Sequence, residues 1–549
     1  MSDQPDRGFS RTAWCVFAAL AFIYVYFFQH YERIPNPNEQ TRLYLTVAIS
    51  ERAEIGIDRE IARFGDTLDV AEYGGRRLCD KAPGLSFIGV PFYKAYRAAS
   101  RLFGHEPAFY EILKLLRVTS VALPSLLLIM LLFWGLSMVE PDERVRLAVI
   151  IVFALGTTAH TYSVLLFSHQ VAGAMGAAAF VLAMKLRRGG SIWLAPPAGF
   201  LAGYAVLSEY PLLITAAITG IYLLATTWRR HGAIVLFVLG AAVPAAILLA
   251  YNKAAFGGWF SLGYGHIANQ YYAQFHQQGA LGVTTPKLDA FVGSFFSSSR
   301  GYFPFQPWLV LAFPGLWLLY GRRGLRAEAV AVTAAIIGFA YFISSFSYWQ
   351  GGGTVSQRHL TALTPWLLIP ITAFTAHAIR SRSAACQWLC AALGLFSIFA
   401  ITASTVPFPF FSTQYPNPLY ELALRLWRLG LIPYSIGRNA GLPGMWAAVP
   451  YLLAVAALGV AYLRYTVPQQ EGFGSWRRRF VSLMAIASVC LAVAAYSHVA
   501  RYNNIEGKTH DLWGIIGNYE PRDADCSDSR CLAIFGRTAE ALEAYRAGR

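Results

Sequence analysis

Charged residues are scarce in this sequence. Asp, Glu, Lys and Arg make up only 14% of its 549 residues, whereas 56% are hydrophobic. Soluble domains carry about 25% charged residues, so the composition excludes an ordinary soluble globular protein. A cleavable signal peptide is also lacking, because no small-residue cleavage site follows the apolar run that begins after Arg7 and Arg11. We expect this run to remain as a membrane anchor.

Linkers and soluble domains are absent as well. No Gly/Ser-rich stretch divides the chain, and the polar tail 501–549 is too short to build a core of its own. Any chemistry is therefore expected in the membrane body and its outer loops.

The seven cysteines provide no metal-binding pattern. The pair Cys526 and Cys531 lies in the polar tail, which has no second ligand pair for a zinc site. If the tail is extracytoplasmic, a disulfide between these two residues is expected. Four others lie within apolar runs, as is typical of small buried hydrophobes: Cys15, Cys386, Cys390 and Cys490.

What the sequence has is a series of apolar runs. Runs of roughly 17–25 residues predict membrane-spanning helices, so the fold class is an all-α polytopic membrane protein. We expect residues 1–12 to be cytoplasmic, 13–500 to form the transmembrane domain and 501–549 to be an extracytoplasmic tail. About thirteen spans are predicted, at 13–30, 118–138, 147–160, 170–185, 192–207, 212–227, 233–252, 306–320, 329–346, 360–378, 386–404, 444–463 and 480–498.

The net charge of +15 reflects membrane topology. Short basic loops mark the cytoplasmic side of a membrane, whereas segment 31–117 is nearly neutral, with thirteen basic and twelve acidic residues. A nucleic-acid partner is therefore not expected. A cytoplasmic N-terminus leaves three long loops outside, 31–117, 253–305 and 405–443, and we expect a bacterial inner membrane. The basic clusters are Lys185–Arg188, Arg229–Arg230, Arg322–Arg326, Arg380–Arg382 and Arg477–Arg479.

The first outer loop is expected to contain amphipathic helices. Leu43 and Val47 fall at i,i+4 spacing, as do Tyr44 and Ala48. The stretch 91–97 mixes aromatic and basic residues, which is typical of a helix lying among lipid headgroups.

Two charged motifs in this loop could carry chemistry. Glu39 follows a Pro-Asn turn at the outer end of the first span, and either complements a helix N-terminus capped by Asn38 or acts as a base. Asp80 and Lys81 precede an Ala-Pro-Gly turn near the membrane boundary. Lys81 is either an ordinary surface lysine or a ligand of a lipid phosphate, for which its ammonium is suited.

Two later loops add candidate binding residues. Trp349 and Arg358 flank a triple glycine, and Arg358 either binds a phosphate or only reaches from a helix end into the headgroup layer. Tyr264 and His266, with Arg300 at the end of the same loop, suit a sugar platform, although an interface belt of aromatic residues would look similar.

Three polar residues near the outer ends of spans are weaker candidates. His160, His169 and Glu209 are ionisable groups within a membrane domain, where such groups are often functional. Their spacing matches no metal-ligand motif, so no metal site is predicted and a divalent cofactor stays open.

The motifs together resemble a known family, the C-type membrane glycosyltransferases related to protein O-mannosyltransferases and the lipid A aminoarabinose transferase. Residues 39–43 are similar to the family's Asp-Glu-x-Arg-Tyr, with Glu39 in place of the aspartate, Gln40 at the second acid and Arg42 retained. Asp80-Lys81-Ala-Pro matches its Glu-Lys-Pro-Pro, and 349–358 is similar to its Trp-x-Gly-Gly…Gly-x-Arg. The changed acids leave the acceptor class and any metal open.

The resemblance implies an inverting transfer of a hexose or pentose from a polyprenyl-phosphate donor on the extracytoplasmic face. Lys81, Arg358 and Arg42 would hold the donor phosphate, Glu39 would be the base, and Asp80 and Trp349 would contact substrate. The acceptor, whether an envelope lipid, a glycan or a protein, is not specified. Three alternatives remain: a polymerase or ligase of undecaprenyl-diphosphate glycans, a secondary transporter, and a structural scaffold, which would leave the paired motifs unexplained.

Overall fold

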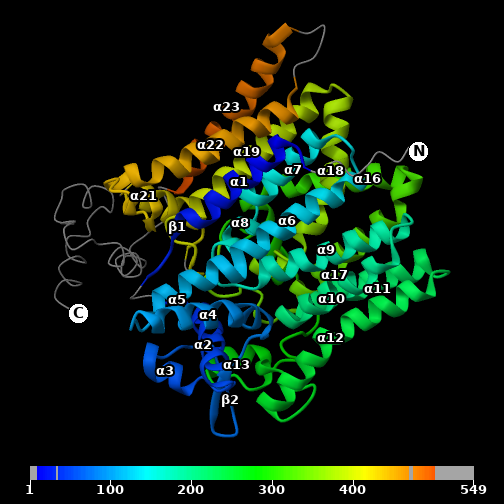
Figure 1. The fold of residues 1–549 in the computed structure, drawn as a ribbon. Helices are drawn as coiled ribbons and strands as arrows, with labels where there is room; N and C mark the ends of the chain where they lie inside the picture. Colours follow the sequence, from blue (N-terminus) through cyan, green and yellow to red (C-terminus); the bar gives the residue numbers. More distant parts are fainter. Residues whose placement is uncertain (1–8, 32–34, 414, 429, 469–473, 501–549) are drawn as a thin grey trace.

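The computed structural model describes residues 9–31, 35–413, 415–428, 430–468 and 474–500, and these are predominantly helical (Figure 1). Each predicted span overlaps a helix of the membrane body. These helices are α1 (Arg11–Tyr26), α6 (Leu123–Gly135), α7 (Glu143–Gly156), α9 (His169–Arg187), α10 (Ala195–Ser208), α11 (Leu213–Thr227), α12 (His231–Phe256), α16 (Ala312–Gly321), α17 (Arg326–Ser345), α18 (Thr364–Arg380), α19 (Ala384–Thr405), α22 (Val449–Thr466) and α23 (Gly474–Ala500).

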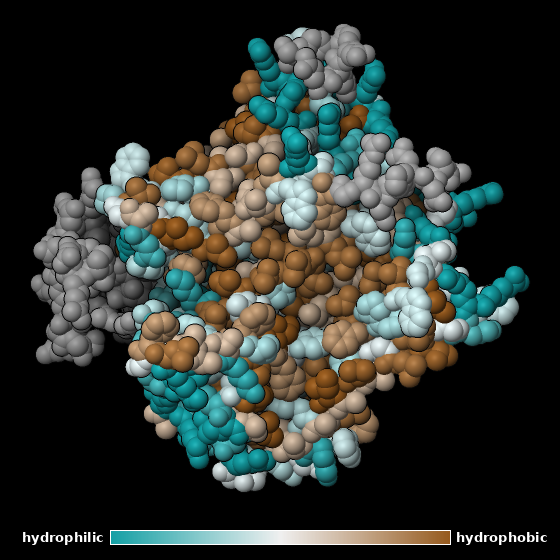
Figure 2. Space-filling view, in the orientation of Figure 1, coloured by the Kyte–Doolittle hydropathy of each residue, from teal (hydrophilic) through white to brown (hydrophobic). Residues whose placement is uncertain are grey.

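The membrane character of these helices follows from their length and composition. Among the described residues, eight helices are long and apolar enough to cross a bilayer, and three shorter apolar helices accompany them. The chain is therefore a multi-pass membrane protein, and the predicted number of thirteen spans is not confirmed. On the face shown in Figure 2, a hydrophobic band separates two hydrophilic ends.

Three of the basic clusters are in contact. Arg230 donates to the carbonyl of Leu186 at 2.7 Å, and Arg187 donates to the carbonyl of Gly324 at 3.4 Å and pairs with Glu328 at 2.6 Å. Parts of the first two segments predicted to be outer lie together, as α2, α3, β2 and α13 show in Figure 1. The shorter elements are α2 (Pro37–Arg52), α3 (Asp58–Phe64), α4 (Gly84–Leu102), α5 (Phe109–Leu116), α8 (Thr158–Ser163), α13 (Gln270–His276), α14 (Leu288–Phe296), α15 (Tyr302–Phe305), α20 (Leu424–Arg428), α21 (Ile436–Asn439), β1 (Phe27–Phe28), β2 (Val70–Tyr73), β3 (Arg76–Cys79) and β4 (Tyr434–Ser435).

The stretch 91–97 is helical as expected and lies within α4, and its position among headgroups stays a prediction. Helix α2 confirms the helix expected around residues 43–48, but it lacks the exposed face of an amphipathic helix there. Residues 38–48 are all buried. The cap also differs from the prediction, because Asn36 rather than Asn38 accepts the N–H groups of Asn38 and Glu39, at 3.0 and 3.4 Å. Pro37 occupies the first helical turn, where its missing N–H costs nothing.

A small β-hairpin, which the all-helical prediction missed, follows α2. Strands β2 and β3 pair antiparallel with Val70 opposite Cys79. Gly74 and Gly75 form the two-residue turn with φ of +60° and +72°, a conformation that glycine adopts without strain. A backbone hydrogen bond from Glu72 to His266 of 2.8 Å ties the hairpin to the second outer segment.

Candidate active site

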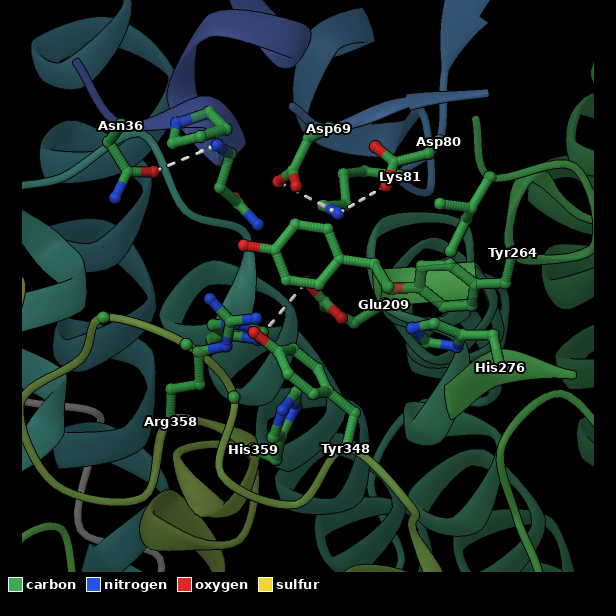
Figure 3. A pocket seen from close by; sticks show the side chains of 18 of the residues that line it. Asn36, Asp69, Asp80, Lys81, Glu209, Tyr264, His276, Tyr348, Arg358 and His359 are labelled. Carbon is green, nitrogen blue, oxygen red and sulfur yellow. Dashed lines mark hydrogen bonds and ion pairs between the residues drawn. The ribbon is translucent and has the colours of Figure 1, made fainter. Parts of the chain in front are cut away.

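A polar pocket of about 750 Å³ lies among the outer segments (Figure 3). Residues from the first outer loop, the second outer loop and the triple-glycine loop before α18 line it, together with two residues at helix ends. We call it the central pocket. Its lining consists of Asn36, Pro37, Asn38, Arg42, Asp69, Asp80, Lys81, His169, Glu209, Tyr264, Ile267, Tyr272, His276, Phe346, Tyr348, Gly351, Gly352, Gly353, Arg358 and His359.

The hairpin brings two carboxylates to one lysine. Because Val70 pairs with Cys79, the next residues outward, Asp69 and Asp80, lie side by side at the open end of the hairpin. Lys81 Nζ lies 3.0 Å from Asp69 Oδ2 and 2.6 Å from Asp80 Oδ2. Lys81 is thus held in place by two acids and faces the central pocket (Figure 3).

Burial and pairing shift the ionisation of this cluster. Burial raises the pKa of Asp80 to about 6, although the neighbouring Lys81 opposes the shift. Burial alone would lower the pKa of Lys81, but Asp69 and Asp80 outweigh it and the pKa is raised. Lys81 therefore remains a cation at neutral pH. Within the described part of the chain, Asp80 Oδ1 is buried without a hydrogen-bond partner.

A second cation enters the pocket from α2. Arg42 Nη2 lies 3.3 Å from Glu209 Oε1 and donates to Ser168 at 2.7 Å. Glu209 also accepts from Ser168 and lies 3.2 Å from His169 Nδ1. Arg42 Nε and His169 Nε2 lack hydrogen-bond partners among the described residues. Arg42 Nε is a donor, and His169 Nε2 is an acceptor in the neutral ring whose Nδ1 donates to Glu209.

The third cation, Arg358, lies across the pocket from Lys81 (Figure 3). It follows the triple glycine, in which Gly351 and Gly352 adopt φ of +68° and +70°. Arg300 supports this loop by donating to the carbonyls of Gln350 and Gly352. Within the described ranges, Arg358 Nε has no hydrogen-bond partner.

Aromatic rings complete the wall. Tyr264 stacks on His276 with centroids 4.6 Å apart, and Lys81 Nζ lies 5.9 Å from the Tyr264 ring centroid. Gly263 lets this segment approach closely, since a Cβ there would lie 2.6 Å from the carbonyl oxygen of Asp80. Burial lowers the pKa of His276 to about 4, so its imidazole is neutral at physiological pH.

Glu39, the predicted base, is not among the residues that line the pocket. Arg117 holds both of its carboxylate oxygens, at 2.8 and 2.7 Å, and the backbone N–H of Leu166 donates to Oε1 at 2.6 Å. Oε1 thus accepts two hydrogen bonds and Oε2 accepts one. These bonds join α2 to the helix segment that carries Arg117.

Three other predicted contacts also lie outside the central pocket. The backbone carbonyl of Trp349 accepts from Gln357 at 2.8 Å, and the carbonyls of the glycine loop hold Arg300. His266 bonds Ser261 at 2.8 Å and stacks on Phe256. These contacts connect the loops around the central pocket, and a role of the three residues in substrate binding stays a prediction. Cys526 and Cys531 lie outside the described residues.

The three weak metal candidates do not converge. His169 and Glu209 are in contact, whereas His160 stacks between Tyr24 and Tyr451 away from the pocket. In the described part of the chain, no group of three His, Cys, Asp or Glu side chains is arranged to hold a metal ion.

The sequence analysis missed several pocket residues. Asp69 could have been found from the Gly74-Gly75 turn, because a two-residue hairpin places it opposite Asp80. Tyr272, His276 and His359 carry no local pattern that separates them from other loop residues. Their place in the site depends on contacts between distant segments.

No protein-family model and no curated protein sequence matches this chain. Its fold is similar to ArnT from Cupriavidus metallidurans bound to undecaprenyl phosphate, with 14% identity over 87% of this chain and 78% of that one, and a TM-score of 0.42. It is also similar to arabinosyltransferase EmbB from Mycobacterium smegmatis, with 13% identity over 91% and 43% of the two chains and a TM-score of 0.41.

A third similar structure is the oligosaccharyltransferase AglB from Archaeoglobus fulgidus in complex with an inhibitory peptide and a dolichol-phosphate. It is 13% identical over 76% of this chain and 58% of that one, with a TM-score of 0.40. All three are C-type glycosyltransferases, the family that the motifs of this sequence resemble. Because each TM-score lies below 0.5, function is inferred below from the geometry of the central pocket.

Proposed function

We propose that the protein is a glycosyltransferase that takes a monosaccharide from a polyprenyl-phosphate donor. One observation carries this proposal: Lys81, Arg42 and Arg358 reach one pocket from three distant segments of a membrane protein. Arg binds phosphate oxygens through paired N–H donors, and Lys adds a point charge. A lipid-linked phosphate fits both the cationic pocket and the membrane setting of the protein, since its chain stays in the bilayer while its head enters the pocket.

The three cations would stabilise the leaving group. The acceptor hydroxyl oxygen forms a bond to the anomeric carbon, the bond from that carbon to the phosphate oxygen breaks, and polyprenyl phosphate leaves with the electron pair. Charge that develops on the phosphate is matched by preorganised donors, which is the strongest form of electrostatic catalysis. A single displacement of this kind inverts the anomeric centre.

The proton of the acceptor needs a carboxylate, and Asp69 takes this role in our proposal. Asp80 is 2% exposed, and Glu209 is engaged by Arg42, Ser168 and His169. Asp69 is half-buried and its side chain faces the pocket. Of the three acids, it is the one that an incoming hydroxyl reaches most easily.

Pocket residues and basic clusters lie at opposite ends of two helices. His169 lines the pocket at the start of α9, whose other end carries the cluster 185–188, and Arg358 lines it just before α18, whose other end carries Arg380. Because basic loops remain in the cytoplasm, we place the reaction on the extracytoplasmic face of a bacterial inner membrane, with the N-terminus inside. An envelope lipid, glycan or protein receives the sugar.

Binding of the donor head tests the proposal directly. Purified full-length protein is melted with polyprenyl phosphate or with polyprenol, which lacks the phosphate. Polyprenyl phosphate should stabilise the folded protein by RT ln(1 + [L]/Kd) and so raise its melting temperature. Arg358→Gln should abolish this shift. The control Arg323→Gln changes an exposed arginine at the opposite end. Equal shifts with polyprenol, or an unchanged shift in Arg358→Gln, would contradict the proposal.

A further inference from the structure

A second cavity opens directly beside the central pocket. Its empty volume is about 1110 Å³, and it shares Asn36, Tyr272, Tyr348, Gly352 and Gly353 with the central pocket. Six aromatic side chains line it, and we call it the aromatic vestibule: Tyr271, Tyr272, Phe275, Tyr348, Phe408 and Phe410.

The aromatic residues form a connected wall. Helix α13 presents Tyr271, Tyr272 and Phe275, and Tyr348 packs against two of them, with centroids 5.6 Å from Tyr272 and 5.2 Å from Phe275. The third outer segment supplies Phe408 and Phe410, which contact each other edge to face at 5.7 Å. Residues from three loops thus converge to form a surface of flat rings.

The charge content separates the two cavities. Among the described residues, no Asp, Glu, Lys or Arg lines the aromatic vestibule, whereas the central pocket has three cations and three carboxylates. The polar groups of the vestibule are uncharged amides and hydroxyls, such as those of Asn36, Gln350 and Thr413. Burial raises the pKa of Tyr348 to about 12, so its phenol is protonated at physiological pH.

Glycine lets the chain pack closely at the border between the two cavities. A Cβ at Gly352 would lie 2.9 Å from the hydroxyl of Tyr348, and one at Gly353 would lie 3.2 Å from the carbonyl oxygen of Phe410. Both glycines line both cavities, so a molecule seated in the vestibule lies next to the central pocket.

We propose that the aromatic vestibule is the acceptor site and that it binds an uncharged saccharide. This role as acceptor site rests on the proposed transferase function. Aromatic faces cover the apolar C–H faces of a sugar ring, while phenol, amide and hydroxyl groups bond its hydroxyls. A charged saccharide would lose its hydration here, and the described lining residues offer no counter-ion to offset that cost.

Direct binding tests this assignment without any donor. Labelled full-length protein in nanodiscs is applied to an array of uncharged oligosaccharides, uronate-containing oligosaccharides and neutral Ser/Thr peptides. An uncharged saccharide should bind, and Tyr271→Ala and Phe275→Leu should each weaken its binding by roughly fivefold or more. The control Phe260→Ala removes an aromatic residue that is 86% exposed in the same outer loop, and it should bind as the wild type does.

The outcomes separate the two proposals. Preference for a uronate or a peptide, no bound uncharged saccharide, or unchanged binding in both vestibule variants would overturn the assignment. Arg358→Gln should keep saccharide binding while losing the response to polyprenyl phosphate. If the wild type binds the saccharide but ignores polyprenyl phosphate, the transferase function fails and the saccharide site stands.

Discussion

Helix α2 carries two charged residues three positions apart whose surroundings are opposite. Glu39 is closed off: Arg117 and a backbone N–H occupy its oxygens, and it lies outside the central pocket. Arg42 faces the central pocket, shares Glu209 with His169, and keeps its Nε without a partner among the described residues. Both clusters are buried, and each contains an arginine paired with a glutamate.

The difference shows what separates a structural ion pair from a binding site. In the Glu39 cluster both carboxylate oxygens accept hydrogen bonds from Arg117, so the pair joins two segments of the chain. In the central pocket, four side chains each have a buried polar atom without a hydrogen-bond partner among the described residues: Asp80, Arg42, His169 and Arg358. Such groups cost free energy in the folded protein unless a ligand completes them.

The largest expected effect concerns the open cluster. Lys81→Met should reduce sugar transfer from a polyprenyl-phosphate donor by about 10²–10³-fold, because one preorganised donor to the leaving phosphate is lost. Transfer is measured with labelled donor in proteoliposomes. Lys94→Met is the matched control, since Lys94 is exposed on α4 and does not line the pocket. Wild-type rates in Lys81→Met would place the phosphate elsewhere.

The closed cluster should respond in stability rather than catalysis. Glu39→Gln leaves the buried Arg117 without its counter-ion, which costs about 3–5 kcal/mol. The melting temperature of the purified protein should fall. The transfer rate per folded molecule should stay within about twofold of the wild type, because Glu39 does not line the pocket. A twofold change in rate corresponds to less than about 1 kcal/mol of activation free energy.

The double variant Glu39→Gln with Arg117→Gln serves as the control for this change. Removing both charges should restore part of the lost stability, since no unpaired charge remains. If Glu39→Gln retains its melting temperature but loses transfer, Glu39 is the base after all and the comparison between the clusters is wrong.

The sequence predicted the helical body well, because apolar runs determine which segments enter a membrane. It also identified Lys81 and Arg358, which stand out beside Ala-Pro-Gly and Gly-Gly-Gly in polar loops. It did not reveal the pairing of Glu39 with Arg117, because Arg117 is 78 residues away. A motif lists residue types in order, but it does not specify which face of α2 is turned toward which neighbour.

A smaller effect should distinguish the two acids beside Lys81. Burial raises the pKa of Asp80 from 3.8 to about 6. The protonated carboxyl therefore contributes to the stability of the folded protein below pH 3.8, and this contribution is lost as the pH rises through about 6. Asp80→Asn should therefore remove the part of the pH dependence of stability that falls between pH 3.8 and about 6. It should also bind a polyprenyl phosphodiester more tightly at pH 7, by about tenfold, on the order of 1.4 kcal/mol.

Binding across pH checks this prediction. The affinity of the wild type should rise as the pH falls from 7.5 to 5.5, and the Asp80→Asn curve should be flat over that range. Asp69→Asn is the comparison, since Asp69 contacts the same ammonium at 3.0 Å. A flat wild-type curve would show that Asp80 does not titrate beside the bound phosphate.

The smallest effect is expected for charges that lie in neither cluster. Glu106 pairs with Arg63 and Arg97 at 2.5 and 2.6 Å, yet its side chain is 60% exposed. Water and salt screen such pairs, so Glu106→Gln should cost less than about 1 kcal/mol, and less still at high ionic strength. Its melting temperature and transfer rate, measured at low and high salt, should match the wild type closely. A large loss in either would mean that the outer face of the first loop contributes to the site, and that charge pairing alone does not separate structural from functional clusters in this molecule.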